Sequence, residues 1–272
     1  MSKKRLLIVT QELSPYTEDT LISELAGKLP LYLNEKGYEI RILMPKFGSI
    51  NERRHRLHEV VRLSGMNIIV DDDDYPLIIK VASLPGARLQ VYFLDNDEFF
   101  KRKSMFTDDD GNAYTDNTDR MVFFCKGVIE TVRKFGWSPD VIHCHGWMTS
   151  LIPTFIRSGY KNDPVFSSSI LVYTAYPHEM DNALQATFMD KALISHIEKE
   201  DLEGYFTNDQ LLVDKGAMQF SDAVVKGSAE LSEDVLKEIE KNGKPILDFS
   251  EENYPASHAE FYKQLLAQIA TS

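Results

Sequence analysis

The sequence predicts an α/β fold with a Rossmann-like parallel sheet and helices on both faces. Three observations support this class. Short apolar runs alternate with longer segments of helical period, and 43% of the residues are hydrophobic. The third is length, because a chain of 272 residues buries roughly 70–75% of its unfolded surface and can support one large core or two small ones.

The first elements follow this pattern. Residues 5–10 are predicted to form a buried strand, and a helix is expected near 18–36. The helix has apolar residues at three- and four-residue spacing and ends at Gly37. A second strand over residues 38–44 stops at Pro45.

The middle of the chain departs from the alternation. Between residues 57 and 94, strand-like runs are separated by glycine, proline and aspartate, which indicates β-hairpins rather than βαβ units. The alternation then returns as a helix, a strand, a helix and two strands at 118–135, 140–144, 147–158, 169–174 and 222–226. We expect a site in the loops after the strands, because ligands of open α/β sheets bind outside the carboxyl ends of the strands.

Charge and cysteine content exclude several classes of protein. The chain has 42 acidic and 30 basic side chains and a net charge of −12, so neither nucleic acid nor an anionic membrane is an expected partner. Cys125 and Cys144 form no disulfide framework and no CxxC zinc pattern, which favours a reducing cytoplasm. No apolar run reaches the ~18 residues of a membrane span, and no secretion signal is visible.

The motifs of several enzyme classes are missing. Neither GxGxxG nor GxxxxGK[ST] occurs, which argues against NAD enzymes and P-loop NTPases, and no GxSxG elbow supports a hydrolase. His143, Cys144 and His145 end a strand, but strand alternation places the histidines on one face and the cysteine on the other. We therefore expect no metal and no cofactor. The histidines either line a polar crevice beside Trp147 or are structural.

Several blocks agree in order with one known family. They lie at residues 11–15, 36–48, 91–102, 114–120, 139–147 and 215–224. Together they resemble the bacterial glycogen synthases and plant starch synthases, in register over about residues 4–240. The resemblance implies the N-terminal, acceptor-binding half of a GT-B glycosyltransferase, with the hairpin insertion. The chain ends where the half that binds most of ADP-glucose would begin.

Three site positions depart from the family pattern. The lysine and the two glycines of its KxGGL element align with Glu18, Thr20 and Leu21. The aspartate of its HDW block is Gly146, and its IHN sequence is replaced at residues 175–177. Because the scaffold motifs persist, the resemblance implies a pseudoenzyme without assigned catalytic residues that does not transfer glucose alone. His178 is a candidate substitute for the lost histidine.

Two functions stay open. One is a non-catalytic or regulatory member of glycogen metabolism that binds α-glucan or a partner synthase. The other is the acceptor half of a split ADP-glucose-dependent glucosyltransferase whose donor domain is another chain. The matched blocks combine aromatic faces with hydrogen-bonding groups, as a sugar site does. The predicted residues for α-glucan or malto-oligosaccharide are Glu12, Tyr114, Asp116, Asn117, His143, His145 and Trp147.

The C-terminal segment is expected to cover the domain. Residues 1–245 are predicted to form the Rossmann-like acceptor-side domain, and residues 246–272 a tail with a capping helix. Phe261, Leu265 and Ile269 have helical spacing in this tail. The resemblance agrees, because the last helix of the GT-B fold crosses back onto the N-terminal domain. A homodimer is the other way to cover an exposed apolar face.

Overall fold

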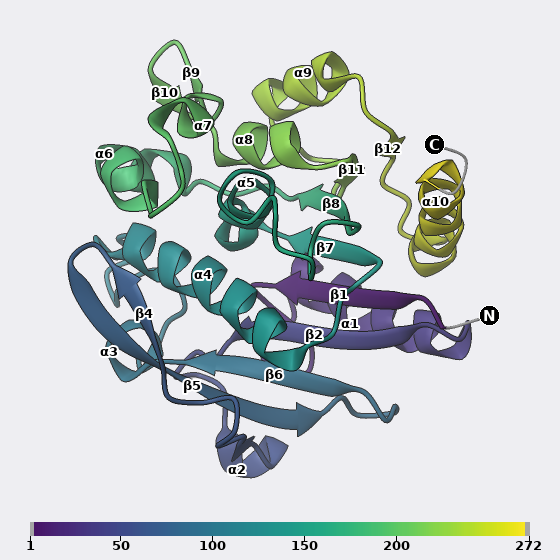
Figure 1. Ribbon diagram of the computed structural model, residues 1–272, viewed down its shortest axis with the longest axis horizontal. Coiled ribbons are helices and arrows are strands. Elements are labelled where there is room, and N and C mark those ends of the chain that lie inside the picture. The colour runs from purple at the N-terminus through teal and green to yellow at the C-terminus, as the bar shows by residue number, and fades with distance from the viewer. Residues whose placement is uncertain (1–2, 270–272) are drawn as a thin grey trace.

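The computed structural model describes residues 3–269, which form a large sheet between two layers of helices (Figure 1). The strand order is β12-β11-β8-β7-β1-β2-β6-β5-β3, and β4 pairs with β5. The strands of this sheet are β1 (Arg5–Thr10), β2 (Glu39–Pro45), β3 (His58–Glu59), β4 (Met66–Val70), β5 (Asp73–Ser83), β6 (Gln90–Asp95), β7 (Val141–His145), β8 (Ile170–Ala175), β11 (Ala223–Lys226) and β12 (Ile246–Leu247). A separate small hairpin contains β9 (Phe206–Thr207) and β10 (Gln210–Leu211).

Helices fill most of the connections between the strands. The α-helices are α1 (Leu21–Glu35), α2 (Glu52–His55), α3 (Asp97–Phe100), α4 (Asn117–Phe135), α5 (Leu151–Thr154), α6 (Asp181–Ala192), α7 (Lys199–Glu203), α8 (Val213–Phe220), α9 (Glu233–Asn242) and α10 (Tyr254–Ile269). A 3₁₀ turn, η1 (Trp147–Thr149), precedes α5, and a π-helical turn, η2 (Phe155–Gly159), follows it.

The sheet is parallel from β12 to β6. β1 lies between β2 and β7, and its residues Leu6 to Val9 are at most 1% exposed. A continuous apolar run is what a strand covered on both faces requires. β5 pairs in antiparallel fashion with both β4 and β6, which confirms the predicted hairpin insertion, and β6 also joins the parallel sheet beside β2.

The helices cover both faces of this sheet, as predicted. α4 crosses one face, and α1 lies behind the sheet (Figure 1). α4 packs against α5 and α6, whereas α10 packs against α1. Along β7, Cys144 interacts with Thr149 of η1, while His143 contacts Tyr262 of α10. The two histidines therefore face the α10 layer, and the cysteine faces the opposite layer.

Two predicted helices have different bounds in the structure. α1 starts at Leu21 because Thr20 and Ser23 cap it: the Ser23 amide donates to the Thr20 hydroxyl at 3.1 Å, and the Thr20 amide donates to the Ser23 hydroxyl at 2.9 Å. The single helix expected over residues 147–158 is instead the succession of η1, α5 and η2.

The segment after residue 245 continues the sheet. β12 pairs in parallel with β11, and α10 follows it. The division of the chain at residue 245 stays a prediction, and the Ile269 side chain and residues 270–272 lie outside the described residues. Within residues 3–269, no helix is both long enough and apolar enough to cross a membrane.

Candidate functional site

The carboxyl ends of three central strands bring the first predicted residues together. Thr10 at the end of β1 is in register with His145 of β7, and His145 is in register with Thr174 of β8. The loops after these strands therefore start side by side. This edge is where the sequence predicts a site.

Glu12 lies in the loop after β1 and is 5% exposed. Its carboxylate accepts hydrogen bonds from the Gln11 side-chain amide at 2.9 Å and from the Thr20 hydroxyl at 2.6 Å. The Thr20 hydroxyl in turn accepts from the Ser23 amide at the start of α1. The first turn of α1 is thus capped by its own side chains, beside a carboxylate. Glu18, on the same loop, is exposed.

The turn after β7 leaves no room for a side chain at position 146. Gly146 has a φ of +84°, and a Cβ atom there would lie 2.4 Å from Oε1 of Gln11. That oxygen accepts a hydrogen bond from the Met148 amide at 3.2 Å. Gln11 therefore fills the space between the first loop and η1 that a side chain at position 146 would need.

His143 and His145 lie beneath α10 and are fully buried, with ring centroids 3.9 Å apart. His143 pairs through Nδ1 with the Tyr262 hydroxyl at 2.5 Å and through Nε2 with the Thr174 hydroxyl at 2.6 Å. His145 pairs through Nδ1 with the Tyr176 hydroxyl at 3.1 Å. Together with Tyr254 and His258 of α10, these side chains form what we call the histidine layer: His143, His145, Tyr176, Tyr254, His258 and Tyr262.

The imidazoles of the histidine layer are neutral at pH 7. Burial lowers the pKa of His145 to about 3 and that of His258 to about 4, and it lowers the pKa of His143 well below its usual value. Within residues 3–269, the Nε2 atoms of His145 and His258 have no hydrogen-bond partner. A buried nitrogen without a hydrogen-bond partner costs free energy of folding, so this layer keeps two unsatisfied polar atoms beneath α10.

The other predicted residues gather near the start of α4. Arg102 makes two hydrogen bonds to the Asp116 carboxylate, at 2.7 and 2.5 Å, and its guanidinium lies 4.4 Å from the centre of the Tyr114 ring. The Asn117 oxygen accepts from Arg120 at 2.6 Å. We call these five residues the arginine cluster. Burial, followed by the charge of Arg102, lowers the pKa of the fully buried Arg120 to about 10.

Trp147 joins the arginine cluster through Phe106. The two rings meet edge to face with centroids 5.1 Å apart, and the Phe106 carbonyl accepts from the Asn117 amide at 2.9 Å. Trp147 is 2% exposed. Of the seven predicted sugar-binding residues, only Tyr114 and Asp116 are partly exposed, and the other five are buried. Their role in sugar binding stays a prediction, and a sugar would reach the histidines only after α10 moved.

The structure gives His178, the candidate substitute for the lost histidine, a partner that the sequence does not indicate, while its role as a substitute stays a prediction. His178, after β8, pairs through Nε2 with Asp214 at 3.1 Å, and Asp214 also accepts from the Tyr173 hydroxyl at 2.6 Å. Burial lowers the pKa of His178 and Asp214 raises it, with a net upward shift. The pair lines a cavity of about 310 Å³ together with Tyr176 and Asp181. His178 and Asp214 are 36 residues apart, so no local spacing could indicate their contact.

No metal centre accompanies these groups: within residues 3–269, no three His, Cys, Asp or Glu side chains are arranged to hold an ion.

Comparisons with known proteins agree with the fold and with the family resemblance. The family model of the starch synthase catalytic domain matches residues 5–247. The glycogen synthase of Chlorobium limicola is 39% identical over 173 residues, covering 63% of this chain and 35% of that protein. The glycogen synthase of Chlorobaculum parvum is 30% identical over 240 residues, covering 88% of this chain and 48% of its own length.

A solved structure shares the fold. The catalytic domain of starch synthase IV from Arabidopsis thaliana, bound to ADP and acarbose, has a TM-score of 0.72 at 18% identity and covers 91% of this chain and 51% of its own. The predicted relation to a GT-B glycosyltransferase domain is confirmed. The chain spans between about a third and a half of the length of these curated relatives. Since the family model covers most of the sequence, this chain belongs to the starch synthase catalytic domain family.

Proposed function

We propose that this chain is an acceptor-side domain of the glycogen and starch synthase type that binds α-glucan and, by itself, does not transfer glucose from ADP-glucose. The observation that carries the proposal is the first turn of α1. There the Ser23 amide donates to the Thr20 hydroxyl, and the Glu12 carboxylate accepts a hydrogen bond from the same hydroxyl. A phosphate group would have to displace this cap and face a carboxylate.

The energetic argument follows from charge. A helix N-terminus favours an anion through its free amides and its dipole, by typically 0.3–1 kcal/mol. Here the cap already uses the Ser23 amide, and Glu12 and Glu18 supply negative charge in the same loop. Losing a hydrogen bond to a charged group costs on the order of 1.5–3 kcal/mol, and repulsion between like charges adds to that loss. We therefore expect weak or no binding of a nucleotide diphosphate at this turn.

The test for transfer is direct. The purified chain is incubated with ADP-glucose and glycogen, and an intact glycogen synthase serves as the positive control. We expect no release of ADP above background. Release of ADP from this chain alone would overturn the proposal. Release only after adding a separately produced donor domain would favour the second candidate, a split glucosyltransferase.

The glucan role rests on the partly exposed edge of the arginine cluster. Tyr114 offers a ring and Asp116 a carboxylate at the surface, the mixture that orients a sugar. Malto-oligosaccharide at millimolar concentration should change the chemical shifts of the amides around residues 114–116. Tyr114→Ala should abolish these changes, whereas Thr115→Ala, at an exposed neighbour, should not. If no amide shifts, the glucan role is wrong and regulation through a protein partner, such as a synthase, becomes the better hypothesis.

A further inference from the structure

The helix α10 is attached to the domain as a terminal element. A turn over residues 251–253, whose side chains are exposed, connects it to β12. α10 packs against α1 and β12 and lies at one side of the molecule (Figure 1). Terminal elements with few neighbours open at a lower free energy than the core of a domain. This attachment allows α10 to open while the central sheet stays folded.

Two tyrosine hydroxyls join α10 to the sheet. Tyr262 pairs with His143 of β7 at 2.5 Å, and the Tyr254 hydroxyl lies 3.5 Å from that of Tyr176, which follows β8. Tyr176 is the middle one of the three residues that replace the family's IHN sequence. A Cβ atom on Gly227 would lie 2.5 Å from the Tyr176 ring. Glycine at position 227 therefore makes room for the ring that reaches α10.

The protonation state of His258 follows from its neighbours. Its Nδ1 atom lies 2.6 Å from the Tyr254 carbonyl oxygen, which can only accept, so Nδ1 carries the hydrogen and Nε2 carries a lone pair. Within residues 3–269, this Nε2 atom has no hydrogen-bond partner. A proton on Nε2 would therefore bring a charge and an N–H group without an acceptor into a side chain that is 1% exposed.

The surroundings of the histidine layer offer no compensation for such a charge. Within the described part of the chain, the only charges that act on the imidazoles of the layer are those of the other imidazoles: His145 and His258 lower the pKa of His143, and His258 lowers that of His145. The carboxylates near the layer act instead on Tyr176 or on Tyr38, which borders Tyr262. These carboxylates are Glu12, Asp140 and Glu260.

We propose that α10 is a lid over the histidine layer and that acid opens this lid. In the closed state the imidazoles of His145 and His258 are held neutral, whereas in the open state water solvates their charged forms. Protons therefore bind the open state preferentially and shift the population towards it. Opening uncovers His143 and His145 at the predicted crevice. The inference does not depend on which ligand binds there.

The size of the effect follows from the pKa values. Burial lowers the pKa of His145 to about 3 and that of His258 to about 4, whereas a solvated imidazole has a pKa of about 6.5. Between pH 7.5 and pH 5, each of these histidines multiplies the ratio of open to closed molecules by about thirty. Because the two imidazoles influence each other, we expect a rise of at least about a hundredfold rather than the full product.

Hydrogen exchange of the full chain measures this opening. The exchange rate of each backbone amide is corrected for the chemical exchange rate at pH 7.5 and at pH 5, which gives an opening constant. At both pH values, the amides of α10 should have an opening constant at least about tenfold larger than those of β1, because β1 opens only when the domain unfolds. The opening constant of α10 should rise at least about a hundredfold from pH 7.5 to pH 5.

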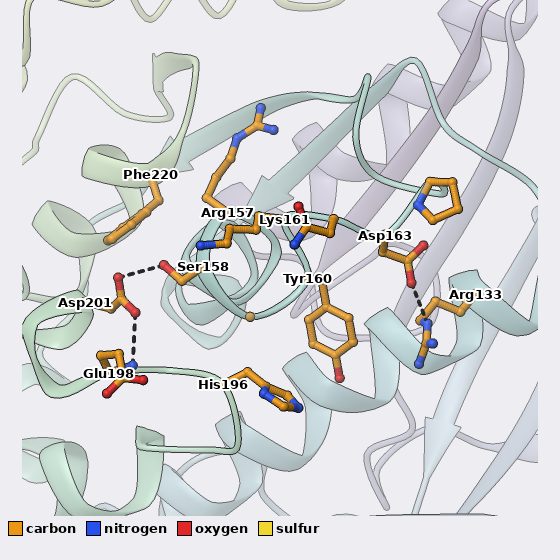
Figure 2. Close-up of a pocket in the computed structure, with 13 residues that line it drawn as sticks. Arg133, Arg157, Ser158, Tyr160, Lys161, Asp163, His196, Glu198, Asp201 and Phe220 are labelled. Atoms are coloured by element: carbon orange, nitrogen blue, oxygen red, sulfur yellow. Dashed lines mark hydrogen bonds and ion pairs between the residues drawn. The ribbon is translucent and has the colours of Figure 1, made fainter.

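Two variants and a control assign this rise to the histidine layer. His258→Gln should make the rise about thirtyfold smaller, and His145→Gln should do the same and serves as the second variant if the first does not fold. The control is His196→Gln, which should leave the rise unchanged. His196 is exposed, lines a surface depression together with Tyr160 and Lys161 (Figure 2), and lies on the loop before α7, far from α10 (Figure 1).

Each outcome decides for or against the lid. Equal opening constants of α10 and β1 would mean that α10 opens only with the whole domain, which overturns the proposal. An opening constant of α10 that does not rise with acid overturns it as well, and so does a rise that is as large in both variants as in the wild type. A larger opening constant for α10, with a rise that either variant reduces and His196→Gln does not, supports the lid.

Discussion

The histidine layer and the arginine cluster contain most of the predicted site residues, yet they are built on different physical principles. The histidine layer is fully buried, neutral and covered by α10, with two ring nitrogens that have no partner among the described residues. The arginine cluster is charged and reaches the surface at the Arg102–Asp116 pair, whose side chains are 28% and 30% exposed. The histidine layer depends on α10 covering it, whereas the arginine cluster depends on attraction between charges that are in contact with water.

This difference shows that sequence blocks which match the same family can lie in very different environments in the structure. A neutral buried layer is disturbed by protonation or by loss of its cover, and it is insensitive to salt. A partly exposed ion pair is weakened by salt and contributes little to stability. Changes of pH, of salt and of single side chains therefore separate the two groups.

The largest effect is expected from removing the cover of the histidine layer. Deleting residues 255–272 removes the buried side chains of His258, Phe261, Tyr262 and Leu265. Each large apolar side chain contributes about 1.5–3 kcal/mol when buried, and the uncovered sheet face would need another cover. We expect lower solubility or self-association in sedimentation velocity. Gln264→Ala, on the exposed side of α10, is the control, and unchanged sedimentation of the deletion variant would refute the capping role.

Acid should act on the same layer with the next largest effect. The pKa values of His145 and His258 are about 3 and about 4 in the folded protein, below the unfolded value of about 6.5. The unfolded chain therefore binds protons first as the pH falls below about 6.5, and stability decreases from there towards the folded pKa values. Between pH 7.5 and pH 5, each of these two histidines lowers the free energy of unfolding by about 2 kcal/mol.

Urea unfolding at pH 7.5 and pH 5 measures this dependence. His258→Gln replaces one titrating ring with a neutral side chain, so the loss of stability between the two pH values should be smaller by about 2 kcal/mol. His196→Gln, at an exposed histidine, should leave the difference unchanged. An equal pH dependence in the wild type and His258→Gln would mean that His258 is not neutral beneath α10.

Much of the fold was predictable because its signals are local. The continuous apolar run of β1 requires cover on both faces, and the glycines, prolines and aspartates between residues 57 and 94 indicate hairpins. The start of α1 was misplaced because Thr17, Asp19 and Thr20 are all residue types that N-caps prefer, and the sequence does not show that Thr20 is the one that caps the helix. The helix over residues 147–158 was predicted as continuous because its apolar spacing does not reveal changes between 3₁₀, α and π geometry.

The site was less predictable because its contacts are long-range. Strand alternation correctly gave the shared face of His143 and His145. It could not show that Tyr262, 119 residues away, pairs with His143. The contact between His178 and Asp214 is also long-range, because α8 brings the Asp214 carboxylate to the end of β8. Aromatic and polar residues in matched blocks also build cores, as the burial of Trp147 and Asn117 shows.

A single hydroxyl should have a moderate effect in the histidine layer. Tyr262→Phe keeps the ring but leaves Nδ1 of His143 without its partner. An unsatisfied buried polar group costs about 1–3 kcal/mol. Urea unfolding at pH 7.5 should show this loss, and 1 M NaCl should not change it. Tyr32→Phe, at a partly exposed tyrosine of α1, is the matched control and should cost little. A loss for Tyr262→Phe that disappears at high salt would contradict the neutral character of the layer.

The smallest effect is expected in the arginine cluster. Asp116→Asn keeps the shape of the side chain and removes the charge that pairs with Arg102 at 2.5 and 2.7 Å. Because both side chains reach water, which solvates the freed guanidinium, the loss should be about 0.2–1 kcal/mol. It should shrink further at 1 M NaCl, where the Debye length is about 3 Å. Asp72→Asn, an exposed carboxylate outside the cluster, serves as the control. Urea unfolding at low salt and at 1 M NaCl measures the loss of stability under each condition.

The contrary outcome concerns the buried Arg120. If Asp116→Asn destabilises the protein more than Tyr262→Phe, Arg120 depends on the Asp116 carboxylate as well, and the arginine cluster is a cooperative core rather than a surface ion pair.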